Sequence, residues 1–359
     1  MDDGGLGLSE EAGIANGDPH ACLHAISEGK DLPPEAAAAL FGRMMDGEVP
    51  PVLTGALLAA LRTKGETVAE MAAAASAMRA RAARLVTSRQ RLVDTCGTGG
   101  DFSGTFNVST AAAFVAVAAG IPVAKHGNRA ASSRCGSADV LEAAGVAIDL
   151  PPEMCGRVLD RAGIAFLYAP NFHPATRHAI GPRREIRIRT VFNLLGPLTN
   201  PAGVRRQAIG VPSEELVAPV AETLKELGTE HALVVHGRDG LDEISVSAPT
   251  VVATVRGGEI RWDEITPEDL DLARHPREAL AGGDASHNAA LMRRVLEGGG
   301  TAAEVDFTAA NAGAAILVGG GAPDLKAGVA QAREILSTRA AADALDELIK
   351  VSQEEARQK

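Results

Sequence analysis

Residues 93–144 read VDTCGTGGDFSGTFNVSTAAAFVAVAAGIPVAKHGNRAASSRCGSADVLEAA. The stretch combines a short apolar strand, a glycine loop, an alanine-rich helix, a second strand and a polar loop that opens another helix. Two such units in succession place two loops at one edge of a parallel sheet, beside helix N-termini whose free N–H groups attract anions. The stretch therefore predicts an α/β fold with a phosphate site built from two loops.

The first loop and the helix after it supply small groups that suit a polyanion. The glycines of the 97–100 loop have no side chains, so their N–H groups can approach phosphate closely and adopt positive φ without strain. Asn107, Ser109 and Thr110 open the following helix, where their short side chains can cap it or bind phosphate or sugar. We expect this loop to hold the more highly charged end of a ligand.

The second loop adds charge and directional donors. Lys125 supplies a compact charge, and further donors come from His126, Asn128, Arg129, Ser132 and Ser133. Each loop alone is most simply a turn, but turns do not require eight hydrogen-bond donors, so the pair indicates function. The sequence has no GxxxxGK[ST] motif and no GxGxxG followed by an acid, which disfavours nucleoside triphosphates and dinucleotides as ligands.

An acidic pair follows a predicted strand at 232–236. Asp242 and Glu243 lie in GRDGLDEIS, residues 237–245, on a loop that we expect to face solvent. Such pairs are usually no more than hydrated surface. Hard carboxylate oxygens beside two phosphate loops nevertheless favour Mg²⁺, which binds a few carboxylates together with waters and substrate phosphates.

A basic run occupies residues 173–201. Five arginines recur on a predicted helix and are ordinarily interpreted as a hydrated basic face; they are Arg177, Arg183, Arg184, Arg187 and Arg189.

Five motifs in order carry a family resemblance. They are DTCGTGGD at 94–101, NVST at 107–110, KHGNRAASSRCGSADVLEAAG at 125–145, RTVFNLLGPLTNP at 189–201, and the Asp242-Glu243 pair. Together, from about Asp18 to near the C-terminus, they are similar to the anthranilate phosphoribosyltransferase family. The resemblance implies transfer of a phosphoribosyl group from phosphoribosyl diphosphate (PRPP) to the amine of anthranilate.

The resemblance also implies roles for individual residues. The expected PRPP contacts are Gly97, Gly100, Asp101, Thr105, Asn107, Val108, Ser109, Thr110, Lys125, His126, Gly127, Asn128, Arg129, Ala130, Ala131, Ser132, Ser133 and Ser137. The expected anthranilate contacts are Gly97, Asn128 and Arg183, and the expected Mg²⁺ ligands are Ser109, Asp242 and Glu243. Lys125 and His126 are the candidate catalytic residues. The role of His126 stays open between orienting or deprotonating the amine and supporting the loop.

This sequence departs from the family pattern at two positions of the basic run. Thr176 stands where methionine is common, and Arg187 stands where glycine is usual. Neither position is an expected ligand, but both bear on how this helix packs.

Hydrophobic periodicity predicts two domains after a loose tail at 1–17. Helical patterns at 34–45, 52–64 and 68–85, with a Thr67-x-x-Glu70 capping box, predict a small α-helical domain at 18–88. The resemblance implies that helices around 183–199 complete it. A large α/β domain at 89–359 should have a central, mainly parallel sheet flanked by helices, with strands at 92–94, 164–168, 207–211 and 232–236. A hairpin at 250–262 should make the sheet mixed, and helix 304–319 should be buried.

Composition bounds the remaining possibilities. The chain has 359 residues, 46% hydrophobic content and a formal net charge of −11, which argues against a nucleic-acid or anionic-membrane partner. The cysteines, Cys22, Cys96, Cys135 and Cys155, form no CxxC pair and suit a reducing cytoplasm. No signal peptide or membrane span is expected. The family resemblance implies a homodimer that contacts through the small domain.

Two other functions stay open from the sequence alone. A pyrimidine nucleoside phosphorylase has a related fold, but its first loop carries a KHSTGG-type lysine that residues 96–100 lack. A catalytically silent, nucleic-acid-binding relative would be expected to be basic and to have lost the KHGN motif or the acidic pair. An assay with PRPP and anthranilate distinguishes all three.

Overall fold

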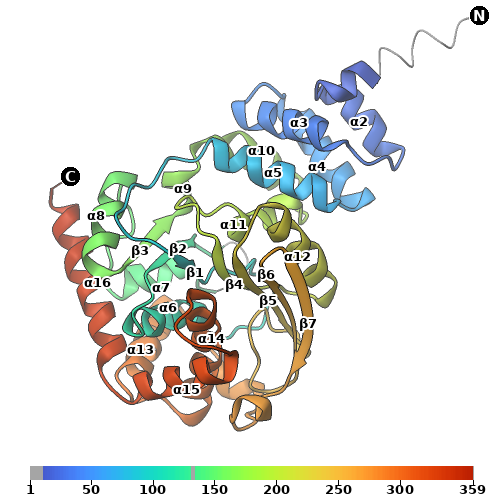
Figure 1. The fold of residues 1–359 in the computed structure, drawn as a ribbon. Helices are drawn as coiled ribbons and strands as arrows, with labels where there is room; N and C mark the ends of the chain where they lie inside the picture. The colour runs from blue at the N-terminus through green and yellow to red at the C-terminus, as the bar shows by residue number, and fades with distance from the viewer. Residues whose placement is uncertain (1–10, 131–133, 359) are drawn as a thin grey trace, which may run out of the picture.

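The structure is a computed structural model that describes residues 11–130 and 134–358. Among these residues, no helix combines the length and the apolar character that a membrane span requires. A helical domain lies above a large α/β domain in Figure 1, and the C-terminal helix runs down one side of the large domain.

Within the described residues, the small domain contains the helices α2 (Pro19–Ser27), α3 (Pro34–Asp46), α4 (Pro51–Lys64) and α5 (Val68–Ala80), and helical residues 11–15 precede α2. The predicted capping box is confirmed, because the Thr67 side chain accepts from the Glu70 N–H and the Glu70 carboxylate accepts from the Thr67 N–H. The predicted helix 68–85 is too long, since α5 ends at Ala80. The other predicted starts and ends differ by one residue or none.

Seven strands form one sheet in the order β3-β2-β1-β4-β5-β6-β7. The first five are parallel: β1 (Val93–Asp94), β2 (Val123–Gly127), β3 (Ile164–Tyr168), β4 (Arg206–Gly210) and β5 (His231–Gly237). The last two are the predicted antiparallel hairpin, β6 (Thr250–Arg256) and β7 (Glu259–Ile265). The carboxyl ends of β1, β2, β4 and β5 therefore meet at one edge, where parallel sheets place their ligands.

Helices cover both faces of this sheet (Figure 1). In chain order, the helices that follow β1 are α6 (Val108–Ala118), α7 (Ser137–Ala143), α8 (Pro152–Ala162), α9 (Ala169–Phe172), α10 (Arg177–Ile186), α11 (Leu195–Leu198) and α12 (Val217–Glu226), of which α10 packs on the small domain and not on the sheet. The C-terminal group is α13 (Ala285–Leu296), α14 (Ala302–Gly319), α15 (Leu325–Leu336) and α16 (Ala340–Ala356). Short 3₁₀ turns occupy Pro174–Thr176, Val191–Asn193, Glu214–Leu216, Glu268–Leu270 and Arg277–Leu280.

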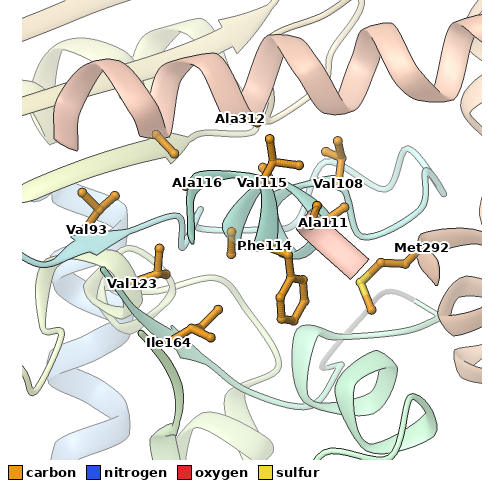
Figure 2. Close-up of a cluster of buried hydrophobic side chains, with 14 of the residues drawn as sticks. Val93, Val108, Ala111, Phe114, Val115, Ala116, Val123, Ile164, Met292 and Ala312 are labelled. Carbon is orange, nitrogen blue, oxygen red and sulfur yellow. The ribbon is translucent and has the colours of Figure 1, made fainter. Parts of the chain in front are cut away.

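Helix α6 lies at the centre of the large domain's core. Figure 2 shows Phe114 and Val115 of α6 among side chains from β1, β2 and β3, with Ala312 of α14 on the other side. Both α6 side chains are fully buried, and burial of such a side chain contributes roughly 1.5–3 kcal/mol. The predicted burial of helix 304–319 is also confirmed. Because this packing holds α6 in place, it also positions the first turn of α6, which lies at the candidate site.

A second apolar core joins the small helices to the sheet. It includes Leu57 of α4, Leu195 of α11 and Val234 of β5. Helix α10 packs against α3 and α4, and α11 packs against α5, so segments from the basic run lie among the N-terminal helices. The predicted boundary between residues 88 and 89 stays a prediction.

Candidate active site

The glycine loop leaves β1 and is pinned against the end of β4. The Thr98 N–H donates to the Gly210 carbonyl at 3.0 Å. A Cβ added to Gly97 would lie 3.1 Å from the same carbonyl oxygen, so a side chain has little room there. Gly99 and Gly100 both have positive φ, at 66° and 91°. The loop's tight turn therefore depends on glycine, as the sequence predicted.

The acidic loop after β5 reaches the same point from the other side. A Cβ added to Gly210 would lie only 1.4 Å from the Asp242 carbonyl oxygen. Beyond the acidic pair, the Ile244 N–H donates to Asn311 Oδ1 at 2.9 Å, and Asn311 Nδ2 donates back to the Ile244 carbonyl at 3.1 Å. The acidic loop is thus held between Gly210 and helix α14, directly beside the glycine loop.

The carboxyl groups of this loop are closer to the interior than the sequence predicted. The expectation of a solvent-facing loop was wrong, because Asp242 and Glu243 are half-buried and the flanking Leu241 and Ile244 are buried. Burial, together with the nearby Asp101 carboxyl group, raises the pKa of Asp242 to about 8. Burial and the charge of Asp242 raise the pKa of Glu243 well above its usual range.

These three carboxyl groups suit a hard cation. Like charges at close range are unfavourable unless a proton or a cation compensates them. In the described part of the chain, the buried Oδ2 atom of Asp101 has no hydrogen-bond partner. Among the described residues, no group of three or more His, Cys, Asp or Glu side chains is arranged as a cage that could hold a metal ion. Mg²⁺ needs no such cage, because it keeps waters and binds substrate phosphates, so the residues present fit it.

The start of α6 lies between the two loops. Gly97, Ser109 and Glu243 line one small cavity of about 20 Å³. The Ser109 carbonyl accepts from the Thr95 hydroxyl at 2.8 Å, which fixes this first turn against the strand. Thr110 follows, and its buried hydroxyl oxygen has no hydrogen-bond partner within the described residues. The structure thus brings two of the predicted metal ligands, Ser109 and Glu243, to one place.

Asn107 ties α6 to the second loop rather than capping it. Its Nδ2 atom donates to the Cys135 carbonyl at 3.1 Å, and its Oδ1 atom accepts from Asn288 Nδ2 at 3.0 Å. Val108 next to it is buried, and Thr105 shares a 3.1 Å hydrogen bond with Ser103. The capping role allowed by the sequence is therefore not observed for Asn107.

Lys125 and His126 lie on a strand. The sequence placed both in the second loop, but they belong to β2 together with Gly127, and both side chains are buried. Parallel pairing with β3 continues from Val123 to Gly127 and extends the strand further than the polar sequence suggested. Lys125 Nζ donates to the carbonyl and hydroxyl oxygens of Thr95 at 3.1 and 3.0 Å, and burial lowers its pKa.

The buried carboxyl group of Asp94 supports strand β2. Asp94 is fully buried; its Oδ1 atom accepts from the His126 N–H at 3.2 Å, and its Oδ2 atom accepts from Asn200 Nδ2 at 2.7 Å. Burial raises its pKa to about 6, against the opposing effect of Lys125. Asn200 also donates to the Ala124 carbonyl at 2.8 Å, so the NP at 200–201 braces β1 and β2.

Two histidines face each other beside these strands. The His126 and His173 rings meet edge to face with centroids 5.1 Å apart, and both residues are buried. Burial lowers the pKa of His126 to about 4 and that of His173 to about 3. Within the described residues, His126 Nε2 and both ring nitrogens of His173 have no side-chain hydrogen-bond partner. His173 was not among the predicted site residues, although the HP at 173–174 begins the basic run.

The second loop begins beyond β2. The Asn128 side chain is exposed, and its carbonyl accepts from the Ala138 N–H at 3.2 Å and from the Ser137 hydroxyl at 3.4 Å. Ala130 N–H donates to Asp139 at 2.9 Å. Arg129 is bound to Glu142 at 2.7 and 2.9 Å, so its charge is already compensated. The predicted contacts Ala131, Ser132 and Ser133 lie outside the described residues.

The arginines of the basic run lie partly on helix α10 and partly beyond its end. Arg183 lies on α10, half-buried, with its guanidinium 5.3 Å from the Phe192 ring centroid, and burial lowers its pKa. The helix ends at Ile186, so the predicted helical placement of Arg187 and Arg189 was wrong. Arg187 has φ 52°, a left-handed conformation that explains why glycine is usual there. Arg189 is half-buried and reaches the glycine loop, which corrects its interpretation as a hydrated face.

Comparisons with known proteins define the class of protein to which this chain belongs. Residues 89–342 match the glycosyl transferase family, a/b domain, and residues 21–82 match the glycosyl transferase family, helical bundle domain. The chain is 51% identical over 336 residues to the anthranilate phosphoribosyltransferase of Halorhodospira halophila, covering 93% of this chain and 98% of that protein. It is 53% identical over 330 residues to that of Rubrobacter xylanophilus, covering 92% and 96%.

Solved structures agree with the sequences. The crystal structure of anthranilate phosphoribosyltransferase from Thermus thermophilus superposes with a TM-score of 0.88 at 46% identity, covering 92% of this chain and 99% of that one. The Saccharomyces cerevisiae enzyme in complex with PRPP and Mg has a TM-score of 0.79 at 25% identity, covering 97% and 96%. This chain therefore belongs to the anthranilate phosphoribosyltransferase family.

Proposed function

We propose that this protein transfers the 5-phosphoribosyl group of PRPP to the amine of anthranilate, giving N-(5-phosphoribosyl)anthranilate and diphosphate. The contact of the glycine loop and the acidic loop at Gly210 is the observation that carries the proposal. It places backbone donors for a diphosphate next to carboxylates for its counter-ion. Membership of the family supports the identity of both substrates, and the step belongs to tryptophan biosynthesis.

In the reaction, the bond between ribose C1 and the diphosphate oxygen breaks with its electron pair on the oxygen. The anthranilate nitrogen forms the new bond to C1 and then loses a proton. The glycine-loop N–H groups and Lys125 stabilise the departing charge, which is worth most in a site that excludes water. The resulting electron-poor C1 accepts a weak nucleophile, so the protein's main task is to position the two substrates.

The proposed Mg²⁺ ligands are Asp242, Glu243 and Ser109. A bound Mg²⁺ would neutralise diphosphate charge and so make it a better leaving group. The half-buried carboxyl cluster with raised pKa values supports this assignment. Asp101, whose carboxyl group interacts with Asp242, would share in holding the ion or its waters.

The remaining proposed donor contacts surround the ribose and its phosphate. Asn107 and Thr110 lie at the start of α6, at the same edge of the sheet as residues 125–130 and 134–137. Arg129 would have to exchange part of its bonding to Glu142 to reach a phosphate. We therefore expect the Arg129 side chain to rearrange when PRPP binds.

For the acceptor, we propose that Arg183, Gly97 and Asn128 hold anthranilate. A planar guanidinium matches a carboxylate with two parallel hydrogen bonds. His126 Nδ1 lies 2.9 Å from the Gly196 carbonyl, which can only accept, so Nδ1 carries the proton and Nε2 is left as an acceptor. With its lowered pKa, this imidazole is neutral at pH 7 and suits removal of the amine's proton.

We also propose a homodimer that contacts through the small domain. A largely apolar groove of about 730 Å³ lies between α4 and α10, lined by residues that include Val52, Gly55, Pro182 and Ile186. Val52 is 88% exposed, which is unusual for a large apolar side chain beside such a groove. Sedimentation should give a dimer for the native chain and a monomer for Val52→Asp. A native monomer at micromolar concentration would exclude the proposal.

The proposed division into a tail at 1–17, a small domain at 18–88 and a large domain at 89–359 follows the two family matches closely. The proposed location is the cytoplasm, which free thiols at Cys22, Cys96 and Cys155 support.

The activity test is direct. Purified protein with PRPP, Mg²⁺ and anthranilate should consume anthranilate fluorescence and release diphosphate in equal amounts. Omission of PRPP or Mg²⁺ should stop the reaction. Phosphorolysis of a pyrimidine nucleoside without loss of anthranilate would instead support the phosphorylase alternative, and binding of nucleic acid without either reaction would support the silent relative.

A further inference from the structure

Arg189 makes a contact that its place in the sequence does not suggest. Its Nη1 atom donates to the Gly100 carbonyl at 3.2 Å, and its Nη2 atom donates to the Gly99 carbonyl at 3.4 Å. The guanidinium thus spans two consecutive peptide groups of the glycine loop. The residue lies three positions beyond α10, on the segment that passes between the helical domain and the sheet.

A pocket beside Arg189 shows that this side chain approaches the glycine loop from the side of the small domain. Arg189 and Gly100 line a polar pocket of about 250 Å³ together with Arg62, near the end of α4, and Glu66, just after it. The pocket therefore separates the small domain from the outer side of the glycine loop. The acidic loop also reaches this region, because the Gly99 N–H interacts with the Asp242 carboxyl group and lowers its pKa against the effect of burial. The glycine loop therefore has both an arginine and the acidic cluster as neighbours.

Peptide geometry connects this contact to donor binding. In a trans peptide, the C=O of one residue and the N–H of the next point in opposite directions. Because the Gly99 and Gly100 carbonyls point to Arg189, the N–H groups of Gly100 and Asp101 point away from it. They therefore point to the side of the loop opposite Arg189, where a diphosphate would bind.

Gly100 is shaped for the arginine as well as for the turn. A Cβ built on Gly100 would lie 2.1 Å from Arg189 Nη1 and 2.9 Å from Cζ. The guanidinium thus packs directly on the Gly100 backbone, where any side chain would displace it. With φ at 91°, the residue is glycine for two independent reasons.

We propose that Arg189 is a positioning residue for PRPP: it fixes the glycine loop with two backbone carbonyls turned outward, so that the next two N–H groups are preorganised for the diphosphate. The inference rests on the proposed function for the identity of the ligand. It assigns Arg189 no contact with substrate. The side chain acts through the loop and, because it comes from the segment between the domains, makes donor binding depend on how the small domain packs.

The first test separates donor binding from acceptor binding. Arg189→Ala should raise the KM for PRPP by about 10- to 100-fold, the range expected when two charge-assisted hydrogen bonds that preorganise a loop are lost. The KM for anthranilate should stay within about twofold. Arg189→Lys should recover less than half of the loss on a logarithmic scale, because an ammonium keeps the charge but lacks the fork. Arg187→Ala, which removes an exposed arginine two positions away, is the matched control.

A second test uses the space that Arg189→Ala leaves in the pocket. Added guanidinium chloride at about 20–50 mM should restore part of the PRPP affinity, whereas urea at the same concentration, a neutral molecule of the same shape, should not. Recovery by guanidinium shows that the missing group itself positions the loop. Equal PRPP KM values for Arg189→Ala and native protein would overturn the inference.

A third measurement avoids the acceptor altogether. Calorimetry with inorganic diphosphate and Mg²⁺ should show weaker binding to Arg189→Ala, by about the same factor as the PRPP KM. Native protein that binds diphosphate in this way but never consumes anthranilate would defeat the proposed function and leave the inference standing. If Arg189→Ala does not fold by circular dichroism, Gly100→Ala displaces the guanidinium by another route and should give the same donor-specific loss. Unchanged diphosphate binding by either folded variant overturns the inference.

Discussion

Gly210→Ala tests whether the contact between the two loops is as tight as the structure indicates. The added methyl carbon would lie 1.4 Å from the Asp242 carbonyl oxygen, whereas an ordinary contact needs about 3.4 Å. The acidic loop must therefore move by roughly 2 Å relative to β4. It cannot move away freely, because both hydrogen bonds of Ile244 to Asn311 hold it from the other side. A displacement of about 1 Å in a positioned site can cost about 100-fold in rate.

We therefore expect kcat/KM for PRPP to fall by at least about 100-fold, together with a higher Mg²⁺ requirement. The fold should survive, because overpacking of this kind costs typically about 1–3 kcal/mol. Anthranilate fluorescence gives the rates, and thermal unfolding by circular dichroism gives the stability. Gly299→Ala is the control for the methyl group, since its Cβ would meet the flexible Arg294 side chain at 3.2 Å, in the turn between α13 and α14. Gly210→Ala with kcat/KM within twofold of native would refute the reasoning.

Arg183→Ala should raise the anthranilate KM and leave the PRPP KM unchanged. The loss of a charged hydrogen bond of roughly 1.5–3 kcal/mol should lower kcat/KM by about 10- to 100-fold. A loss of PRPP affinity instead would place this arginine in the PRPP subsite. Asp242→Asn should lower turnover by at least about 100-fold. It should leave the Tm without Mg²⁺ equal or higher, because an uncharged amide replaces a carboxyl group whose ionised form is disfavoured by burial and by Asp101; a clearly lower Tm would contradict the electrostatic argument. Burial lowers the pKa of His126 to about 4 and of His173 to about 3, so the unfolded chain binds more protons than the folded chain below pH 6.5, and the free energy of unfolding should fall by about 2 kcal/mol for each histidine between pH 7 and pH 5. In urea titrations, His173→Leu should make the free energy of unfolding depend less steeply on pH. An unchanged pH dependence would show that this histidine is not buried in its neutral form.

The sequence predicted the site's components better than their surroundings. The glycine loop, the start of α6 and the acidic pair were predicted at their observed places because each is a local pattern attached to a strand end. The burial of Asp242 and Glu243 was not predicted, since it depends on Gly210 and Asn311, which are distant in sequence. Exposure of a loop is a property of what packs on it, and no window of sequence contains that information.

The same limit explains the errors in the second motif and the basic run. Lys125 and His126 are polar, which suggests a loop, but pairing with β3 and the support of Asp94 keep them on a buried strand. Five arginines at short intervals suggest one exposed helix face. The left-handed Arg187 ends that helix and turns the chain, which brings Arg189 to the glycine loop.

By itself, the sequence determined the order of helices and strands, the mixed sheet, the small helical domain and the family. These features follow from periodicity, caps and motifs that act over a few residues or one supersecondary unit. The tertiary structure alone decided which side chains meet: Gly210 with the acidic loop, His126 with His173, and Arg189 with Gly100. Each contact joins segments that are far apart in the chain, and Arg189 lies 89 positions beyond Gly100. Their distances arise from the packing of the two domains around α6 and the sheet, which fixes backbone positions that no local pattern encodes.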